Sequence, residues 1–129
     1  MHGECKITEI FTDDFNKILL DFVYEKMLDA GFRGREFYVW KYLYCNSLNL
    51  KICKPRAILA KELDMNLCSI GAPLTKLKKH QYIKIVRRQT ETGRYLTSEI
   101  RVTLPVSLIA ELRESNNLIY QFFRKGSVS

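Results

Sequence analysis

The hydrophobic positions of this chain recur every three or four residues over most of its length, a spacing that predicts amphipathic helices. The first helix is expected over residues 12–30, with Thr12 as its N-cap and Gly31 as its C-cap. Its apolar stripe consists of Phe15, Ile18, Leu19, Phe22, Val23 and Met27. A second helical run follows Gly34, and its stripe is too aromatic to face water, so we expect it to be buried. That stripe consists of Phe37, Trp40, Leu43 and Tyr44.

The helical period breaks between residues 46 and 54, where Leu48, Leu50 and Ile52 alternate and predict a short strand. Pro55 then opens another helix, because the first helical position does not need a backbone N–H. Residues 64–66 predict a tight turn, and residues 67–80 predict a further helix.

After residue 80 the hydrophobic period changes from 3.6 to 2. Residues 82–88 and 95–104 alternate as strands, and the turn residues 90–93 between them predict a β-hairpin. Pro105 ends the second strand, and residues 106–124 are expected to form one last helix.

Two helices joined by a tight turn and followed at once by a hairpin are typical of a winged helix-turn-helix. We therefore expect one α+β, mainly α, domain over residues 1–129. Its winged helix-turn-helix core spans residues 34–104, flanked by terminal helices over 12–30 and 106–124. Apolar residues at the angle of the motif support this prediction: Ala60, Met65, Ile70, Leu74 and Leu77.

Charge adds the first functional indication. The chain carries 21 Lys and Arg residues against 14 Asp and Glu residues, a net charge of +7. Residues 1–31 hold three bases and seven acids, a net charge of −4, whereas residues 32–129 hold 18 bases and seven acids, a net charge of +11. A basic body favours a polyanionic partner, although a basic surface also serves solubility alone.

Residues 10–88, about 60% of the chain, resemble the N-terminal winged-helix domain of phage replication protein O and related replication initiators. The segments that carry the resemblance are Ile10–Phe11, Gly34–Phe37, Ala60–Leu63, Leu77 and Tyr82–Ile85. The helix-turn-helix part is also similar to transcription regulators, including those of the MarR type. The resemblance implies binding of double-stranded DNA, with residues 67–76 reading the major groove.

The candidate DNA-binding residues fall into three groups, at the hairpin tip, at the start of the Pro55 helix and on the helix predicted over residues 67–80. Residues 76–94 hold seven Lys or Arg residues and one acid, and we expect Arg87, Arg88 and Arg94 to cluster at the hairpin tip, beside the aromatic Tyr95. Basic residues at and after the start of the Pro55 helix are expected to hold a flanking phosphate. The full set is Lys54, Arg56, Ser69, Thr75, Lys76, Lys79, Arg87, Arg88, Arg94 and Tyr95.

The presumed recognition helix departs from the usual pattern, because residues 67–73 offer only Ser69 for contacts with base edges. Pro73 also removes one hydrogen bond from a helix that starts at Leu67. Three interpretations stay open. The helix begins near Gly71; or its small residues approach DNA closely and contact thymine methyl groups; or this surface binds protein.

The aromatic residues of the second helix, among them Tyr38, Tyr42 and Tyr44, raise the question of base stacking. Core packing is the favoured interpretation because they share a helix with a buried stripe.

Other functions lack a motif. We find no phosphate-binding glycine loop, no pattern of catalytic residues around His80 and no close-spaced metal ligands, so we expect no enzyme, cofactor or metal. The cysteines are expected to be core residues or unpaired thiols. With no membrane-length apolar run and no export signal, the cytoplasm is the expected compartment.

Two further expectations concern partners. The terminal helices favour a homodimer, because a two-fold protein matches a two-fold DNA site. The alternative function is a protein-interaction module built on a winged helix. DNA replication initiation and transcription regulation are equally compatible with the sequence.

Overall fold

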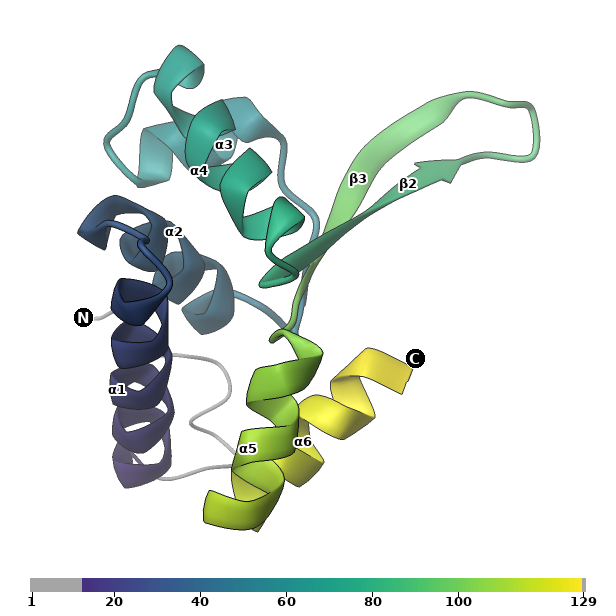
Figure 1. The fold of residues 1–129 in the computed structure, drawn as a ribbon. Helices are drawn as coiled ribbons and strands as arrows, with labels where there is room; N and C mark the ends of the chain where they lie inside the picture. Colours follow the sequence, from purple (N-terminus) through teal and green to yellow (C-terminus); the bar gives the residue numbers. More distant parts are fainter. Residues whose placement is uncertain (1–12, 129) are drawn as a thin grey trace.

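The computed structural model describes residues 13–128, with side chains described for residues 15–124 (Figure 1). The helices are α1 (Asp13–Asp29), α2 (Gly34–Cys45), α3 (Arg56–Glu62), α4 (Leu67–Lys79), α5 (Val106–Ser115) and α6 (Asn117–Val128). The strands are β1 (Lys51–Ile52), β2 (Ile83–Gln89) and β3 (Tyr95–Val102), in the sheet order β1-β3-β2. The fold is α+β, mainly α: a winged helix-turn-helix with flanking helices, as the sequence predicts. The expected N-cap Thr12 lies outside the described residues.

The turn between α3 and α4 forms as the sequence predicts. Asp64 adopts a positive φ of 55°, and the N–H of Met65 donates to the carbonyl of Ala60 over 2.8 Å, which closes the end of α3. Asn66 is the N-cap residue of α4. Ala60 and Ile70 are buried on either side of this turn, so the two helices pack closely.

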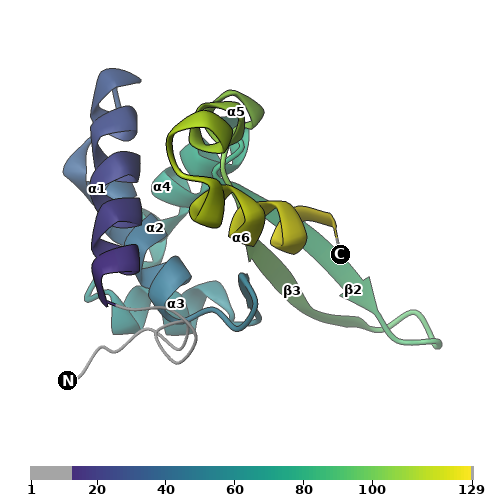
Figure 2. The ribbon, with the colours of Figure 1, turned by 90° about the horizontal axis from the view of Figure 1, so that it is seen from below.

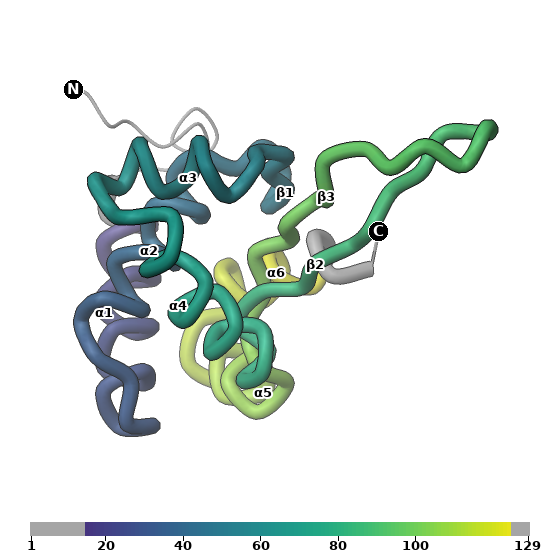
Figure 3. Tube along the Cα trace, turned by 90° about the horizontal axis from the view of Figure 1, so that it is seen from above, coloured from purple at the N-terminus to yellow at the C-terminus, as the bar shows by residue number. Residues whose placement is uncertain are grey.

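The hairpin of β2 and β3 is antiparallel and projects well beyond the helices (Figures 1 and 3). Its turn is closed by the N–H of Thr90, which donates to the carbonyl of Arg94 over 2.8 Å. Gly93 has a φ of 85°, a conformation that side chains disfavour.

Strand β1 is shorter than the alternating pattern predicts. Asn49 and Leu50 have positive φ values of 53° and 65°, so the chain enters extended geometry only at Lys51. Leu50 and Ile52 are buried as expected, but Leu48 is 65% exposed.

The core joins α2 to the base of the hairpin. Trp40 and Tyr44 are fully buried and stack at 5.5 Å between ring centroids. The indole N–H of Trp40 donates to the carbonyl of Tyr82 over 3.1 Å. Core packing is thus confirmed for Tyr44, whereas Tyr38 is exposed and Tyr42 is half-buried. Ile18, expected in the apolar stripe of α1, is also exposed.

The last helix is the main departure from the predicted elements. The sequence predicts one helix over 106–124, but Asn116 is extended (φ −154°, ψ 91°) and separates α5 from α6, which takes a different direction (Figure 2). The side-chain oxygen of Asn116 accepts the N–H of Ile119 over 3.3 Å, so Asn116 caps the new helix. The change of direction brings Leu112, Ile119 and Phe123 together into the core.

Candidate nucleic-acid interface

Helix α4 presents two different sides. Its buried side consists of Ile70, Pro73, Leu74 and Leu77. On the opposite side an exposed stripe runs along the helix, which we call the outer stripe: Cys68, Ala72, Thr75 and Lys79. Because α4 begins at Leu67, the interpretation in which the helix starts near Gly71 is wrong. Pro73 lies inside the helix and is buried.

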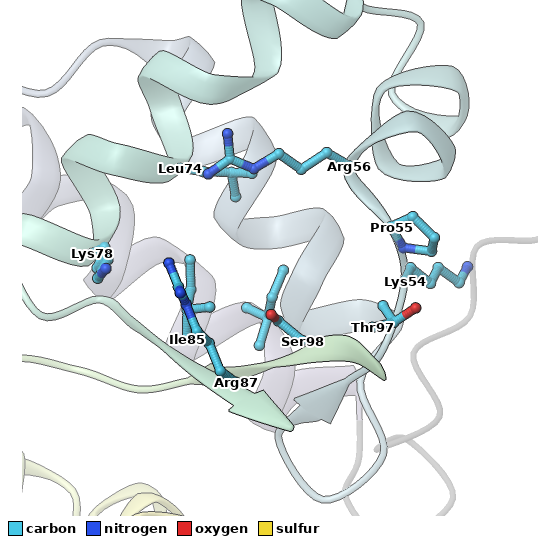
Figure 4. A pocket seen from close by; sticks show the side chains of 10 residues that line it. Lys54, Pro55, Arg56, Leu74, Lys78, Ile85, Arg87, Thr97 and Ser98 are labelled. Carbon is cyan, nitrogen blue, oxygen red and sulfur yellow. The ribbon is translucent and has the colours of Figure 1, made fainter. Parts of the chain in front are cut away.

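A cleft of about 350 Å³ lies between the start of α3, helix α4 and the hairpin (Figure 4). We call it the basic cleft; its lining residues are Lys54, Pro55, Arg56, Leu74, Lys78, Ile85, Arg87, Thr97, Ser98 and Ile100. No Asp or Glu residue is among them. The cleft therefore combines cationic and hydroxyl groups and contains no lining anion.

Three cations in the basic cleft come from three different elements. Arg56 begins α3, Lys78 lies in the last turn of α4, and Arg87 lies on β2. Figure 4 shows Arg56 reaching toward Leu74 while Arg87 points into the same space from the strand. All three are exposed, and within residues 15–124 none of them forms an ion pair with a carboxylate. Their charges are thus available to an anionic ligand.

Gly71 lies beside one of these cations. A Cβ atom placed on Gly71 would lie 3.5 Å from Nη1 of Arg56, an ordinary van der Waals contact. The guanidinium group of Arg56, from the start of α3, therefore lies beside Gly71 in the first half of α4.

A β-bulge positions the third cation. Val86 pairs with Glu99, but Arg88 pairs with Leu96, so Thr97 and Ser98 together lie opposite Arg87. Beyond the bulge Gln89 pairs with Tyr95. Because paired residues and residues two apart on a strand share a face, Tyr95 lies on the face that carries Arg87. Tyr95 is 67% exposed.

Arg88 lies on the opposite face of the hairpin. Its guanidinium group donates two hydrogen bonds to the carbonyl of Thr97, over 2.9 Å from Nε and 2.7 Å from Nη2. Arg94 is exposed in the turn, where its N–H donates to the hydroxyl of Thr90 over 3.1 Å. Arg87, Arg88 and Arg94 therefore do not share one face, which differs from the predicted cluster at the hairpin tip.

Lys54 lines the cleft but its ammonium group turns away from it (Figure 4). Nζ of Lys54 lies 2.8 Å from Oε1 of Glu62 and 3.3 Å from the hydroxyl of Tyr42. The Tyr42 hydroxyl also donates to Glu62. These contacts partly neutralise Lys54 within the protein.

The ammonium group of Lys76 also has partners within the protein. Its Nζ lies 3.6 Å from a carboxylate oxygen of Glu36, which is buried, and donates to the carbonyl of Gly31 over 3.3 Å. It also lies 4.8 Å from the centroid of the Phe32 ring. Ser69, seven residues earlier, shares this side of α4 and is half-buried. The structure thus places Thr75 and Lys79 on the outer stripe, and Ser69 and Lys76 off it.

Sequence reasoning missed three cleft residues, Lys78, Thr97 and Ser98. Two signals were present in the sequence. Lys78 lies four residues after the buried Leu74, so the two are neighbours on the helix surface. Ser98 lies two residues before the buried Ile100 on β3, so the two share a face of the strand. Nothing in the sequence marks the bulge that adds Thr97.

We next consider metal ligands, membrane-spanning helices and cysteines. The described residues contain no cluster of three or more potential metal ligands, and none of their helices has the length and hydrophobicity needed to span a membrane. Cys53 and Cys68 are free and exposed. Cys45 is disulfide-bonded, so the expectation of unpaired thiols is wrong for that residue, and Cys5 lies outside the described residues.

No protein-family model matches the chain, and no curated protein matches it in sequence. The chain is similar to the solved structure of a possible transcriptional regulator from Methanosarcina mazei Go1, with 15% sequence identity. The match covers 84% of this chain and 76% of the other, with a TM-score of 0.48. A likeness at this level does not carry the fold or the function of that protein over to this one.

Proposed function

We propose that this chain binds double-stranded DNA, with the outer stripe of α4 in the major groove and the phosphate backbone in the basic cleft, and that it catalyses no reaction. The observation that carries the proposal is the set of three cations, Arg56, Lys78 and Arg87, which converge on a cleft without a lining carboxylate. Phosphate contacts of this kind fix the position of a protein on the duplex and supply most of its affinity.

Three further candidate residues extend this surface. Lys79 continues the outer stripe, and Arg94 and Tyr95 extend the contact along the hairpin. The resemblance to replication initiators and MarR-type regulators supports a role in replication initiation or transcription regulation of a phage, plasmid or bacterial element.

We further propose a homodimer that associates through the terminal helices. Val106 of α5 and Leu118 of α6 are large apolar side chains that are exposed to solvent in the monomer. Sedimentation velocity should detect a mass twice that of the chain, and a single species of 15.2 kDa at all concentrations would contradict it.

The DNA-binding proposal is tested by fluorescence anisotropy with a labelled duplex. The cleft variant Arg56→Gln/Lys78→Gln/Arg87→Gln should lose most of the affinity at low salt. A matched control, Lys17→Gln/Lys41→Gln/Arg113→Gln, removes the same charge from exposed positions on α1, α2 and α5. It should keep nearly all of the affinity.

Equal losses in the two variants would show that net charge, and not the cleft, drives binding. If the wild-type protein does not bind duplex DNA even at low salt, the proposal fails. The neutral start of the outer stripe would then favour the interaction module, and partner searches with the Ala72→Arg variant as a negative control would follow.

A further inference from the structure

The outer stripe of α4 has a chemistry that restricts what it can read. Its first three side chains are the thiol of Cys68, the methyl group of Ala72 and the hydroxyl and methyl groups of Thr75, all exposed. Specific pairing with guanine uses Arg or Lys, and pairing with adenine uses Asn or Gln, each through two hydrogen bonds. None of these residue types occurs among the first three positions of the stripe.

These side chains are also short, so the backbone of α4 can approach the base edges closely. On the side of α4 next to the cleft, Gly71 has no side chain at all, and a Cβ atom placed there would meet only the Arg56 guanidinium group, at 3.5 Å. In the major groove the apolar group that small, apolar side chains can contact is the C5-methyl group of thymine.

We propose that the outer stripe distinguishes bases by their C5-methyl groups, so that the protein binds thymine-containing duplexes more tightly than duplexes in which uracil replaces thymine. This inference rests on the proposed function, because the cleft cations must first hold the duplex against α4. Lys79 ends the stripe and contacts phosphate or guanine, neither of which is altered by a methyl group on thymine.

The test compares two duplexes of equal length and sequence, one with thymine and one with deoxyuridine at every such position. Burial of one methyl-sized group changes affinity by about fourfold, so the uracil duplex should bind about fourfold more weakly for each methyl contact. A second pair, with cytosine or 5-methylcytosine in a G·C-rich duplex, should show the methylated duplex binding more tightly.

Two variants of Thr75 assign the effect to α4. Thr75→Val keeps the methyl group and replaces the hydroxyl, so it should keep the preference for thymine over uracil. Thr75→Ser keeps the hydroxyl and removes the methyl group, so it should reduce that preference. Each preference is a ratio measured within one protein, and a loss of folded protein therefore cancels from it.

The outcomes separate the two proposals. Equal affinities for the thymine and uracil duplexes, with duplex binding intact, would overturn the methyl readout and leave DNA binding standing. An equal preference in Thr75→Ser and the wild-type protein would likewise overturn the assignment to the outer stripe. Failure to bind either duplex would overturn the proposed function itself.

Discussion

At the scale of single residues, adjacent arginines on β2 have different tasks. Arg87 points into the basic cleft, whereas the guanidinium group of Arg88 is held by the carbonyl of Thr97 on the other face of the hairpin. A charge count along the sequence cannot separate them, because successive side chains of a strand point to opposite faces and only Arg88 meets a carbonyl group there.

This difference gives a matched pair of substitutions. Arg87→Gln should weaken duplex binding and lower the slope of log K against log salt by about one unit, since one phosphate contact is lost. Arg88→Gln should leave that slope nearly unchanged and make the hairpin less stable. Anisotropy titrations at several salt concentrations measure both; equal changes in slope would contradict the assignment of Arg87 to phosphate.

Lys76 is a DNA-binding candidate from the sequence, yet its ammonium group lies against Glu36, whose side chain is only 5% exposed. Lys76→Met should lower the free energy of unfolding by about 1–2 kcal/mol, because the buried carboxylate loses the nearer of two cations and keeps only Nε of Arg35, at 3.8 Å. It should leave duplex affinity nearly unchanged.

The control for that substitution lies three residues further along α4. Lys79→Met removes an exposed cation from the outer stripe, so it should weaken duplex binding with little change in stability. Urea unfolding and anisotropy separate the two effects. A Lys76→Met variant that folds normally but binds DNA poorly would show that Lys76 leaves Glu36 to contact DNA.

At the scale of elements, periodicity predicts the helices, the helix-turn-helix and the hairpin. These are the features that depend on which residues are buried, and burial follows the hydrophobic pattern. The pattern does not reveal the break at Asn116, because Leu112, Ile119 and Phe123 are buried together on both sides of it. The bulge in β3 and the positive φ angles before β1 also escape prediction, since local backbone geometry decides them.

The cap at the break between α5 and α6 should contribute measurably to stability. Asn116→Ala removes the side-chain oxygen that accepts the N–H of Ile119 and should cost about 1 kcal/mol of stability. The neighbouring Asn117→Ala, at an exposed position, should change stability much less. Thermal unfolding compares them, and a greater loss in Asn117→Ala would contradict the capping role of Asn116.

At the scale of the whole molecule, the charges are separated. Helix α1 carries exposed acids at Asp21, Glu25 and Asp29. It lies across the molecule from the hairpin, which supplies one wall of the basic cleft (Figures 1 and 3). Such a distribution orients the cleft toward a polyanion during approach. The sequence predicts this asymmetry, but only the fold brings Arg56, Lys78 and Arg87 together from separate elements.

The buried phenols predict how the whole domain responds to alkali. Burial raises the pKa of Tyr44 above its ordinary value, and the hydroxyl donates to Oδ1 of Asn16 over 2.6 Å. Burial also raises the pKa of Tyr82. Because the pKa is higher in the folded state, the stabilisation is complete below the unfolded pKa of about 10 and is lost as pH rises toward the folded value.

The free energy of unfolding should therefore fall above pH ~10. Tyr44→Phe should make that fall shallower, whereas Tyr24→Phe, at an exposed position, should leave it unchanged. Urea unfolding at increasing pH checks this, and the same pH dependence in the wild-type protein and Tyr44→Phe would contradict the role of Tyr44.

The salt dependence of duplex binding tests most directly whether the basic cleft holds DNA phosphates. For the wild-type protein log K should fall linearly with log salt concentration, and the variant Arg56→Gln/Lys78→Gln/Arg87→Gln should lose about three units of slope along with its affinity. An unchanged slope in this variant, or no duplex binding by the wild-type protein near ~50 mM salt, would contradict this role of the cleft.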